Sequence, residues 1–234
     1  MFPGTWAQLT PDKPALVIAD EEASYLQERT LRELAPDLVL AAGDLPWSYL
    51  EWIASSVDAP MVFVPGNHDP EITSARQRRN GTWTDGGLVC DAPRPHGAVN
   101  ADQRVVEAAG LRIAGLGGCV RYRNGPHQYT QRQYNGRAKK LLRRARSTGP
   151  VDVLLTHAPP LGLGDGEDGP HVGIEALHGV LERLEPTWHL HGHIHPYGMT
   201  MPDRQVGITT IRNVIPWKVL DITPKLSAVA ANPA

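Results

Sequence analysis

Cysteine is nearly absent from this chain of 234 residues. Cys90 and Cys119 are its two cysteines, and neither belongs to a C-x-x-C pair. Two cysteines do not make the disulfide framework of a small secreted domain. The sequence therefore predicts a cytoplasmic protein, in a compartment that keeps thiols reduced.

Long apolar runs and an excess of one charge are missing too. There is no stretch of 18 apolar residues, so no transmembrane helix is expected. The N-terminal stretch MFPGTWAQLTPDKPA lacks a basic segment followed by an apolar one, so it does not resemble a secretory signal. A formal charge of −2 gives no general attraction to nucleic acid or to an anionic membrane.

Glycine and proline are abundant, with 23 and 21 residues, and imply many loops. The length fits one large domain or two small ones. Neither an internal repeat nor a linker composition is visible. We therefore expect a single domain over 1–234, with its motif-bearing core at about 14–222.

Apolar runs and helical patterns alternate in the first third of the chain. PALVIAD (14–20), DLVLAAGD (37–44) and APMVFVPGNHD (59–69) are typical of buried strands. Between them, SYLQERTLRELAP and WSYLEWIASSV are typical of helices, the first with a capping-box pattern at Ser24 and Gln27. A β-α-β-α-β order with short connections predicts a parallel sheet covered by helices.

The rest of the chain is less regular at first, and strands and helices alternate again towards its end. RQRRNGTWTDGG (76–87) is predicted as a loop, and VVEAAGLRIAGLGGCVRY as two β segments joined at Ala109-Gly110. NGRAKKLLRRARSTG is predicted as a basic helix. VDVLLTHAPP and TWHLHGHIHPYG are predicted strands on either side of the helix IEALHGVLERLEP. Segments 206–212 and 214–222 are expected to be closing strands, antiparallel to their neighbours.

Polar side chains follow five of the predicted strands. Asp20, Asp44 and Asn67 come just after the first three, and His157 and the run HLHGHIH (189–195) follow two later ones. In open α/β sheets, ligands bind outside the carboxyl ends of the strands. The sequence therefore predicts one site built from these five strand ends.

The motifs, taken together, resemble those of the calcineurin-like metallophosphoesterases. That family has D-x-H, GD, GNH(D/E), H and GH-x-H in this order. This chain has GD (43–44), GNHD (66–69), TH (156–157) and GHIH (192–195). The resemblance spans about 14–222, and THAPP, HGHIHPYG and a late RNV are similar to the smaller bacterial phosphodiesterases of the family.

The resemblance implies an α/β fold of four layers, in which two packed mixed β-sheets are flanked by helices. It also implies a centre of two divalent ions that share Asp44. Asn67, His157 and His193 would complete one site, and Asp20 and His195 the other. Two cations about 3.5–4 Å apart hold a bridging hydroxide and neutralise charge on the phosphate. Carboxylate and imidazole without thiolate favour Mn, Fe or Zn.

The same resemblance assigns two catalytic residues beside the metals. His68 would face the leaving oxygen and donate a proton or stabilise its charge. Asp69 would orient that imidazole, an arrangement suited to general-acid catalysis.

The first motif departs from the family. Where D-x-H is expected, the chain has Asp20-Glu21-Glu22. Glu22 has the register of the missing histidine, so it is a candidate oxygen ligand. The alternative is an incomplete first metal site in which water takes the vacant position.

The histidine run divides at Gly192. His189 and His191 share one face of a strand by period-two alternation. Gly192 lets the backbone turn, which places His193 and His195 in the loop as ligands. His191 is expected to hydrogen-bond a ligand or a carbonyl, and His189 to be a core histidine.

Substrate contacts are less strongly encoded. Arg121 and Tyr122, in the glycine-rich segment 115–129, are candidates for contact with a phosphate ester, or else parts of an ordinary loop. The basic helix at 137–146 is either a nucleic-acid contact or a solvated face.

The sequence thus predicts a metal-dependent phosphoesterase. We expect a phosphodiesterase on a small or nucleotide-like phosphoester, acting through a metal-bridging hydroxide, with no membrane partner. A second hypothesis is a degenerate relative that binds without turnover, which Glu22 favours and His68 opposes. A third is a nuclease on nucleic-acid ends, favoured by the basic helix alone.

Overall fold

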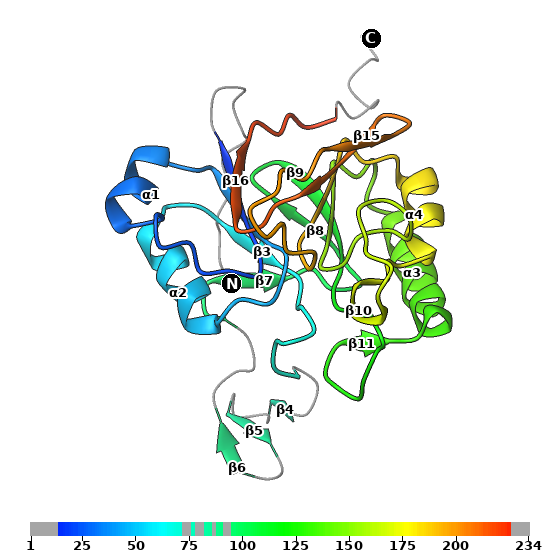
Figure 1. Cartoon of the computed structure of the whole chain (residues 1–234). Helices are drawn as coiled ribbons and strands as arrows, with labels where there is room; N and C mark the ends of the chain where they lie inside the picture. Colours follow the sequence, from blue (N-terminus) through cyan, green and yellow to red (C-terminus); the bar gives the residue numbers. More distant parts are fainter. Residues whose placement is uncertain (1–13, 72–75, 78–81, 86–87, 91–94, 226–234) are drawn as a thin grey trace, which may run out of the picture.

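The computed structural model describes residues 14–71, 76–77, 82–85, 88–90 and 95–225. Two β-sheets form the larger part of it, each with a pair of helices on its outer face (Figure 1). Among the described residues no helix is long and apolar enough to cross a membrane.

The first sheet has the strand order β16-β1-β2-β3-β7. Strands β1, β2, β3 and β7 are parallel, and β16 pairs antiparallel with β1. The helices α1 and α2 connect the first three strands, as the predicted β-α-β-α-β order requires. The bounds are β1 (Ala15–Ile18), α1 (Glu28–Leu34), β2 (Leu38–Ala41), α2 (Trp47–Ser56), β3 (Met61–Phe63), β7 (Ala98–Asn100) and β16 (Trp217–Leu220).

The second sheet has the order β14-β15-β13-β12-β9-β8. Its four inner strands are parallel, and the edge strands β8 and β14 are antiparallel to their neighbours. Both sheets are therefore mixed. The bounds are β8 (Val105–Ala108), β9 (Leu111–Leu116), α3 (Gln131–Ala145), β12 (Val153–Thr156), α4 (Ala176–Leu184), β13 (Trp188–His191), β14 (Arg204–Val206) and β15 (Thr209–Asn213).

Alternation along the strands produces four layers. In β1, Val17 faces the second sheet and packs in one cluster with Ile113 and Val153. Its neighbours Leu16 and Ile18 face the other way, into a cluster with residues of α1 and α2. A third cluster joins the outer face of the second sheet to α3 and α4. The predicted order of helices, sheet, sheet and helices is confirmed.

Smaller elements lie at one end of the molecule. They are β4 (Arg76–Gln77), β5 (Trp83–Asp85) and β6 (Leu88–Cys90) in a three-stranded sheet, the pair β10 (Cys119–Val120) and β11 (Gln128–Tyr129), and the short helix η1 (Gly169–His171). The prediction of a loop at 76–87 is wrong for β4 and β5, which pair with each other. Residues 78–81 and 86–87 of that segment lie outside the described part of the chain.

Two other local predictions need correction. The capping box at Ser24 and Gln27 does not form: α1 begins at Glu28, and Gln27 makes no side-chain cap. A capping box occurs instead at Thr130 and Gln133, where it starts α3. Of the closing strands, β16 is antiparallel to β1 as expected, while β15 is antiparallel to β14 but parallel to β13.

Candidate metal centre

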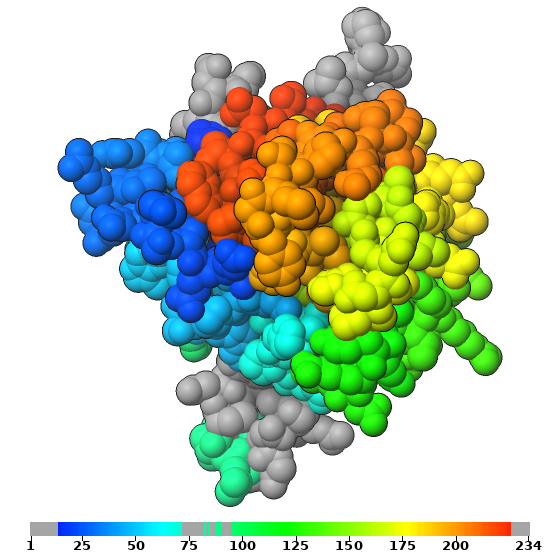
Figure 2. All heavy atoms as spheres, in the orientation of Figure 1, coloured from blue at the N-terminus to red at the C-terminus, as the bar shows by residue number. Residues whose placement is uncertain are grey.

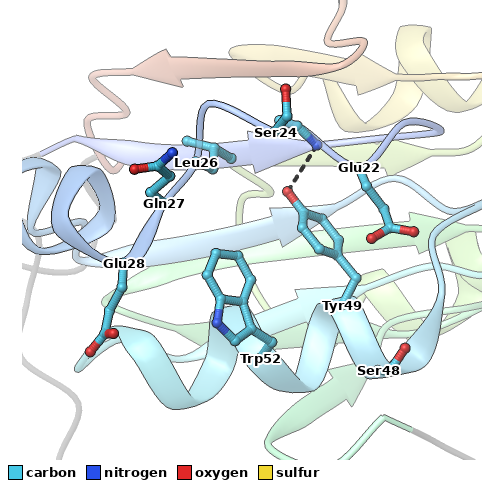
Figure 3. Close-up of a pocket in the computed structure, with 9 residues that line it drawn as sticks. Glu22, Ser24, Leu26, Gln27, Glu28, Ser48, Tyr49 and Trp52 are labelled. Carbon is cyan, nitrogen blue, oxygen red and sulfur yellow. Dashed lines mark hydrogen bonds between the residues drawn. The ribbon is translucent and has the colours of Figure 1, made fainter.

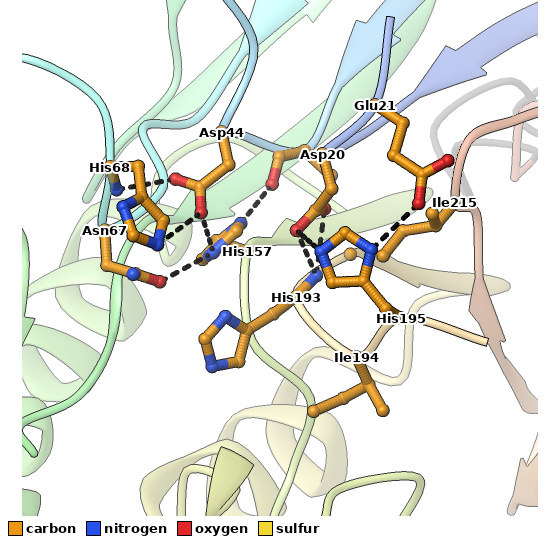
Figure 4. Close-up of polar contacts among 12 residues, drawn as sticks. Asp20, Glu21, Asp44, Asn67, His68, His157, His193, Ile194, His195 and Ile215 are labelled. Atoms are coloured by element: carbon orange, nitrogen blue, oxygen red, sulfur yellow. Dashed lines mark hydrogen bonds and ion pairs between the residues drawn. The ribbon is translucent and has the colours of Figure 1, made fainter. Parts of the chain in front are cut away.

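Ends of strands from both sheets meet in one place. Asp20, Asp44 and Asn67 follow β1, β2 and β3, while His157 and His193 follow β12 and β13. Figure 4 shows their side chains converging. On the face in Figure 2, the blue and cyan N-terminal atoms meet the orange and yellow loops of the C-terminal half. The two sheets thus bring together the strand ends that the sequence singled out.

Asp44 and two histidines form the tightest group of potential metal donors among the described residues. One ligand atom each from Asp44, His157 and His193 lies within 4.8 Å of the others. The Nε2 atom of His157 is 3.4 Å from Asp44 Oδ2 and 3.0 Å from the side-chain oxygen of Asn67. A carboxylate, an amide oxygen and two imidazoles therefore face a common point.

Asp20 and His195 form a second group next to the first. The Nε2 atom of His195 is 3.9 Å from Asp20 Oδ1. Asp20 Oδ2 also accepts a hydrogen bond of 2.9 Å from the backbone N–H of His193, which ties this group to the first one.

Each of the three imidazoles hydrogen-bonds through one nitrogen and turns the other towards the centre or a neighbouring donor. The hydrogen-bond acceptors are the Ala42 carbonyl for His157 (2.8 Å), the Pro170 carbonyl for His193 (2.9 Å) and the Glu21 carboxylate for His195 (2.9 Å). Metal-bound histidines are held in this way, because the bond fixes the tautomer and the ring orientation. The donor set therefore fits divalent cations.

The charges of the centre are arranged around Asp44. Burial disfavours its charged form, but the charge and hydrogen bond of His157, together with the N–H and charge of His68, outweigh this effect and lower the pKa of Asp44 to about 2. Burial opposes charge on His157 as well, yet Asp44 raises the pKa of His157 to about 9. Without a metal, the proton on His157 balances Asp44, and a bound cation would take the place of that proton.

Burial is the main cause of the pKa shifts of His193 and Asp20. It lowers the pKa of His193 to about 3, so this imidazole is neutral and ready to act as a ligand. It raises the pKa of Asp20 to about 6. A divalent cation would favour the charged form of Asp20, since an opposite charge nearby offsets desolvation.

Three of the predicted donors have backbones in the left-handed region. The φ angles of Asp20, Asp44 and His193 are 61°, 55° and 68°. Tight turns with hydrogen bonds from residue i+2 to residue i enclose Asp20 (Glu21 N to Ala19 O) and His193 (Ile194 N to Gly192 O). Such conformations cost on the order of 1–3 kcal/mol and cluster at functional sites. Their presence at three donors supports a built site.

The motif glycines are required by close packing. A Cβ atom on Gly192 would lie 2.1 Å from Asp20 Oδ2, and one on Gly66 would lie 2.0 Å from Asp44 Oδ1. The strand β13 ends at His191, so its alternation stops before the histidines of the loop, as predicted. The residue with the left-handed backbone is His193 and not Gly192, and Gly192 makes room for the Asp20 carboxylate.

The structure does not place Glu22 among the donors. Glu22 is exposed and lines a separate pocket with Ser48, Tyr49 and Trp52, where its side chain lies beside Tyr49 (Figure 3). Burial raises the pKa of the Tyr49 hydroxyl, and the charge of Glu22 adds to the rise. The neighbouring Glu21 contacts a predicted ligand instead, a role that the sequence reasoning missed.

Asp69 also differs from its predicted role. It is buried, and its Oδ2 atom accepts hydrogen bonds from the backbone N–H groups of Gly66 (2.7 Å) and Asp44 (3.2 Å). Asp69 therefore fixes the two motif loops and makes no described contact with the His68 ring. The carboxylate near that ring is Asp44, with Oδ2 4.0 Å from His68 Nε2.

One of the two candidate substrate residues reaches the centre. The Tyr122 hydroxyl accepts a hydrogen bond of 3.3 Å from the Asn67 amide, which turns the Asn67 oxygen towards His157. Arg121 instead donates to the backbone carbonyl of Gln128 at 3.1 Å and to the side chain of Gln133. The structure therefore brings Tyr122 to the site and not Arg121.

His189 and His191 lie outside the centre. Both are buried on the same face of β13, with ring centroids 5.8 Å apart. His191 Nδ1 bonds to the Gly192 carbonyl at 3.0 Å, and His189 Nε2 bonds to the Thr156 hydroxyl at 2.8 Å. The period-two assignment of the run is thus correct up to His191.

Comparisons with known proteins identify the family of this chain. The family model for calcineurin-like phosphoesterases matches residues 19–197. Two Caenorhabditis elegans proteins are similar over shorter stretches: UPF0046 protein T07D4.2 is 53% identical over 53 residues, and UPF0046 protein C25E10.12 is 36% identical over 102 residues. These stretches cover 21% and 40% of this chain, and only 13% and 34% of the relatives.

A solved structure shares the fold. The protein TT1561 of Thermus thermophilus superimposes with a TM-score of 0.59 over 89% of this chain and 94% of that chain. The sequence identity is 15%, so this likeness concerns the fold alone.

Proposed function

This chain belongs to the calcineurin-like phosphoesterase family, a family of metal-dependent phosphoesterases, and we propose that it hydrolyses phosphodiesters at a centre of two divalent ions. The observation that carries the proposal is the gathering of two groups of donors near Asp44. Asp44 lies close to Asn67, His157 and His193, and Asp20 and His195 form the neighbouring group (Figure 4).

The donors divide into two unlike sets around the shared carboxylate. The set with Asn67, His157 and His193 contains two imidazoles, which suit Zn²⁺ or Fe. The set with Asp20 and His195 contains two carboxylates once Asp44 is counted, which suits Mn²⁺ or Mg²⁺. We therefore expect two ions of different affinity, the second set exchanging its metal more readily.

The chain's own groups support hydrolysis beside these ions. Two bound cations would supply an activated water and neutralise the charge that develops on the phosphate. His68 is 62% exposed and faces the space in front of Asp44, so its imidazolium can protonate the departing oxygen. Its backbone N–H donates to Asp44 Oδ1 at 2.7 Å, which fixes its position relative to the metals.

A diester fits the charge of the site better than a monoester. In the described part of the chain, no lysine or arginine forms an ion pair with the donors, and Arg121 is held by Gln128 and Gln133. A monoester dianion carries a second charge that arginine or lysine usually neutralises. A small diester, with one charge, can be held by the two cations alone.

The substitution Asp44→Ala tests the proposal. It removes the only ligand shared by both ions, so bound metal should fall from two equivalents to well below one and diester hydrolysis should be lost. Metal content is measured by mass spectrometry of the purified protein, and turnover with bis(p-nitrophenyl) phosphate and added Mn²⁺. Asp203→Ala is the matched control, because Asp203 pairs with Arg212 at the surface and should change neither quantity.

The same measurements separate an enzyme from a binding module. Two equivalents of metal and no turnover of mono- or diesters in the wild-type protein would favour the binding module. Retention of two equivalents in Asp44→Ala would refute Asp44 as the bridge.

A further inference from the structure

A cavity of about 360 Å³ opens beside the candidate metal centre, on the side of His68. Its walls come from the loop that leads from β2 into α2 and from the loop after β3. The residues lining it are Asp44, Leu45, Pro46, Trp47, His68, Asp69 and Pro70. One wall of the cavity is thus shared with the metal centre, and the remainder is not.

Most polar groups in these walls already have partners. The Asp69 carboxylate accepts from two backbone N–H groups of the motif loops. Pro46 and Pro70 have no N–H to offer. The Pro46 carbonyl accepts from the N–H groups of Tyr49 and Leu50, at 2.9 and 3.1 Å. The Pro70 carbonyl accepts from His127 Nε2 at 2.9 Å.

The cavity therefore presents mainly carbon. Leu45 is buried, Trp47 is half-buried, and the rings of Pro46 and Pro70 are exposed. Besides the two carboxylates, the side chains of the lining that can hydrogen-bond are the His68 imidazole, which is 62% exposed, and the indole N–H of Trp47. A group that enters beyond His68 meets mainly apolar walls, of which Trp47 is part.

We infer that this cavity is the subsite for the alcohol of the ester, and that it selects phosphoesters whose leaving group is apolar, aromatic above all. The inference rests on the proposed function, since it places the leaving oxygen at His68. In the reaction the water oxygen bonds to phosphorus and releases a proton to solvent, from which His68 is later reprotonated, while the P–O bond to the alcohol breaks. The His68 proton passes to the alcohol oxygen, and the alcohol leaves through the cavity.

Two physical effects make the cavity favour an aromatic leaving group over a hydroxylated one. An aromatic ring gains by leaving water and by stacking on Trp47. A hydroxylated group of similar size would lose hydrogen bonds to water without replacement, and this loss weakens its binding. Sugar-like alcohols should therefore be disfavoured.

Phosphonates test this inference without turnover, because their P–C bond is not hydrolysed. The Mn²⁺-loaded protein is titrated by calorimetry with methylphosphonate, phenylphosphonate and 2-hydroxyethylphosphonate. We expect phenylphosphonate to bind at least ~10-fold more tightly than methylphosphonate, and 2-hydroxyethylphosphonate to bind no more tightly than methylphosphonate.

The variants locate the effect. Trp47→Ala should weaken phenylphosphonate about 10-fold and leave methylphosphonate unchanged. Trp47→Phe keeps a ring and disturbs the fold less. Its affinity for phenylphosphonate should lie between those of the wild type and Trp47→Ala. Trp52→Ala is the matched control: Trp52 is also in α2, but it lines the separate pocket with Glu22 and Tyr49 (Figure 3). It should leave all three affinities unchanged.

Several results would overturn the subsite. They are equal affinities for phenyl- and methylphosphonate, tightest binding of the hydroxyethyl compound, or equal weakening of all three ligands by Trp47→Ala. Failure of the proposed function looks different. If the wild-type protein binds the phosphonates in the expected order but hydrolyses no ester, the apolar binding site is supported and the proposed enzymatic function is refuted.

Discussion

The His68 side chain lies at the edge of the centre, where it touches no other donor closely. Its Nε2 atom is 4.0 Å from Asp44 Oδ2, and its ring is largely exposed. Removing the ring should therefore leave the metal donors in place and affect only the leaving group.

We predict that His68→Ala keeps two equivalents of metal and slows turnover by roughly 10²–10⁴ for esters with poor leaving groups. Esters of p-nitrophenol need less protonation and should lose less. The check is the ratio of kcat/KM for p-nitrophenyl and phenyl diesters, in the wild type and the variant. An equal loss for both esters would argue against proton donation.

Glu21 and Glu22 are neighbours in sequence with different surroundings. Glu21 Oε1 lies 2.9 Å from His195 Nδ1, while Glu22 lines the pocket of Tyr49 and Trp52. A carboxylate that holds a ligand histidine raises its basicity and fixes its orientation. Glu21, not Glu22, should therefore tune the affinity of the site formed by Asp20 and His195.

We predict that Glu21→Gln weakens the more readily exchanged Mn²⁺ by roughly 10-fold, towards the lower end of such effects because Glu21 is half exposed. Glu22→Gln is the matched control and should leave both ions bound as in the wild type. Competition titrations with a fluorescent chelator measure this affinity apart from turnover. If Mn²⁺ bound more weakly to Glu22→Gln and not to Glu21→Gln, Glu22 would be the metal ligand.

At the scale of elements, the turn after β13 holds the centre together. Gly192 lies against the Asp20 carboxylate, and the next N–H, from His193, donates to that carboxylate. A side chain at 192 would push Asp20 away from its partners without disturbing the strand before it.

We predict that Gly192→Ala lowers bound metal from two equivalents towards one and keeps the circular dichroism spectrum of the wild type. Gly179→Ala is the control, since a Cβ at this position in α4 meets nothing within 4 Å. It should retain both ions and raise the free energy of unfolding by about 0.5–1 kcal/mol, as expected for glycine in a helix. Full metal content in Gly192→Ala would show that the contact tolerates a methyl group.

The helix α3 illustrates how a sequence pattern can have a structural cause. Arg137 pairs with Asp102 at 2.6 Å and lies 3.8 Å from the centroid of the Tyr129 ring. Arg144 donates to the backbone carbonyl of Gln103 at 2.7 Å. Part of the basic pattern therefore fastens α3 to the second sheet, which weakens the case for a nucleic-acid contact.

At the scale of the whole molecule, acid should destabilise the metal-free fold through its buried histidines. Burial lowers the pKa of His189 well below 6.5 and that of His191 to about 4. In the unfolded chain both protonate near pH 6.5. Below that pH the unfolded state binds more protons, so stability present above pH 6.5 is lost as the pH falls towards 4.

We predict that the free energy of unfolding in chelator falls between pH 6.5 and 5, and that His189→Leu makes this slope shallower by about 1.4 kcal/mol per pH unit. The Thr156 hydroxyl still donates to the Ala158 carbonyl in the variant, so no new buried group is left unpaired there. Asp20 and His193 also titrate, but they are present in both proteins and cancel in the difference. Urea titrations at several pH values measure the slopes, and equal slopes would contradict the prediction.

The sequence by itself determined the strand ends and most of the candidate donors. Apolar runs that end in Asp20, Asp44, Asn67, His157 and the GHIH segment need only local information, because period-two burial and short connections specify a parallel sheet. Parallel strands all present their carboxyl ends at one edge, so polar residues after them must lie near one another. The patterns predicted a parallel sheet covered by helices, and the family resemblance implied the four-layer fold.

The tertiary structure decided how side chains near those ends are used. The left-handed backbone of Asp20, with the Glu21 N–H bonded back to Ala19, breaks the alternation and turns Glu21 towards His195 in place of Glu22. The Asp69 carboxylate accepts hydrogen bonds from the backbone N–H of Gly66 in its own loop and from that of Asp44, 25 residues away in sequence. The cavity at Trp47 exists because two loops from neighbouring strands leave a gap between them. Such contacts depend on distances between segments far apart in the chain, and no local pattern of residues encodes these distances.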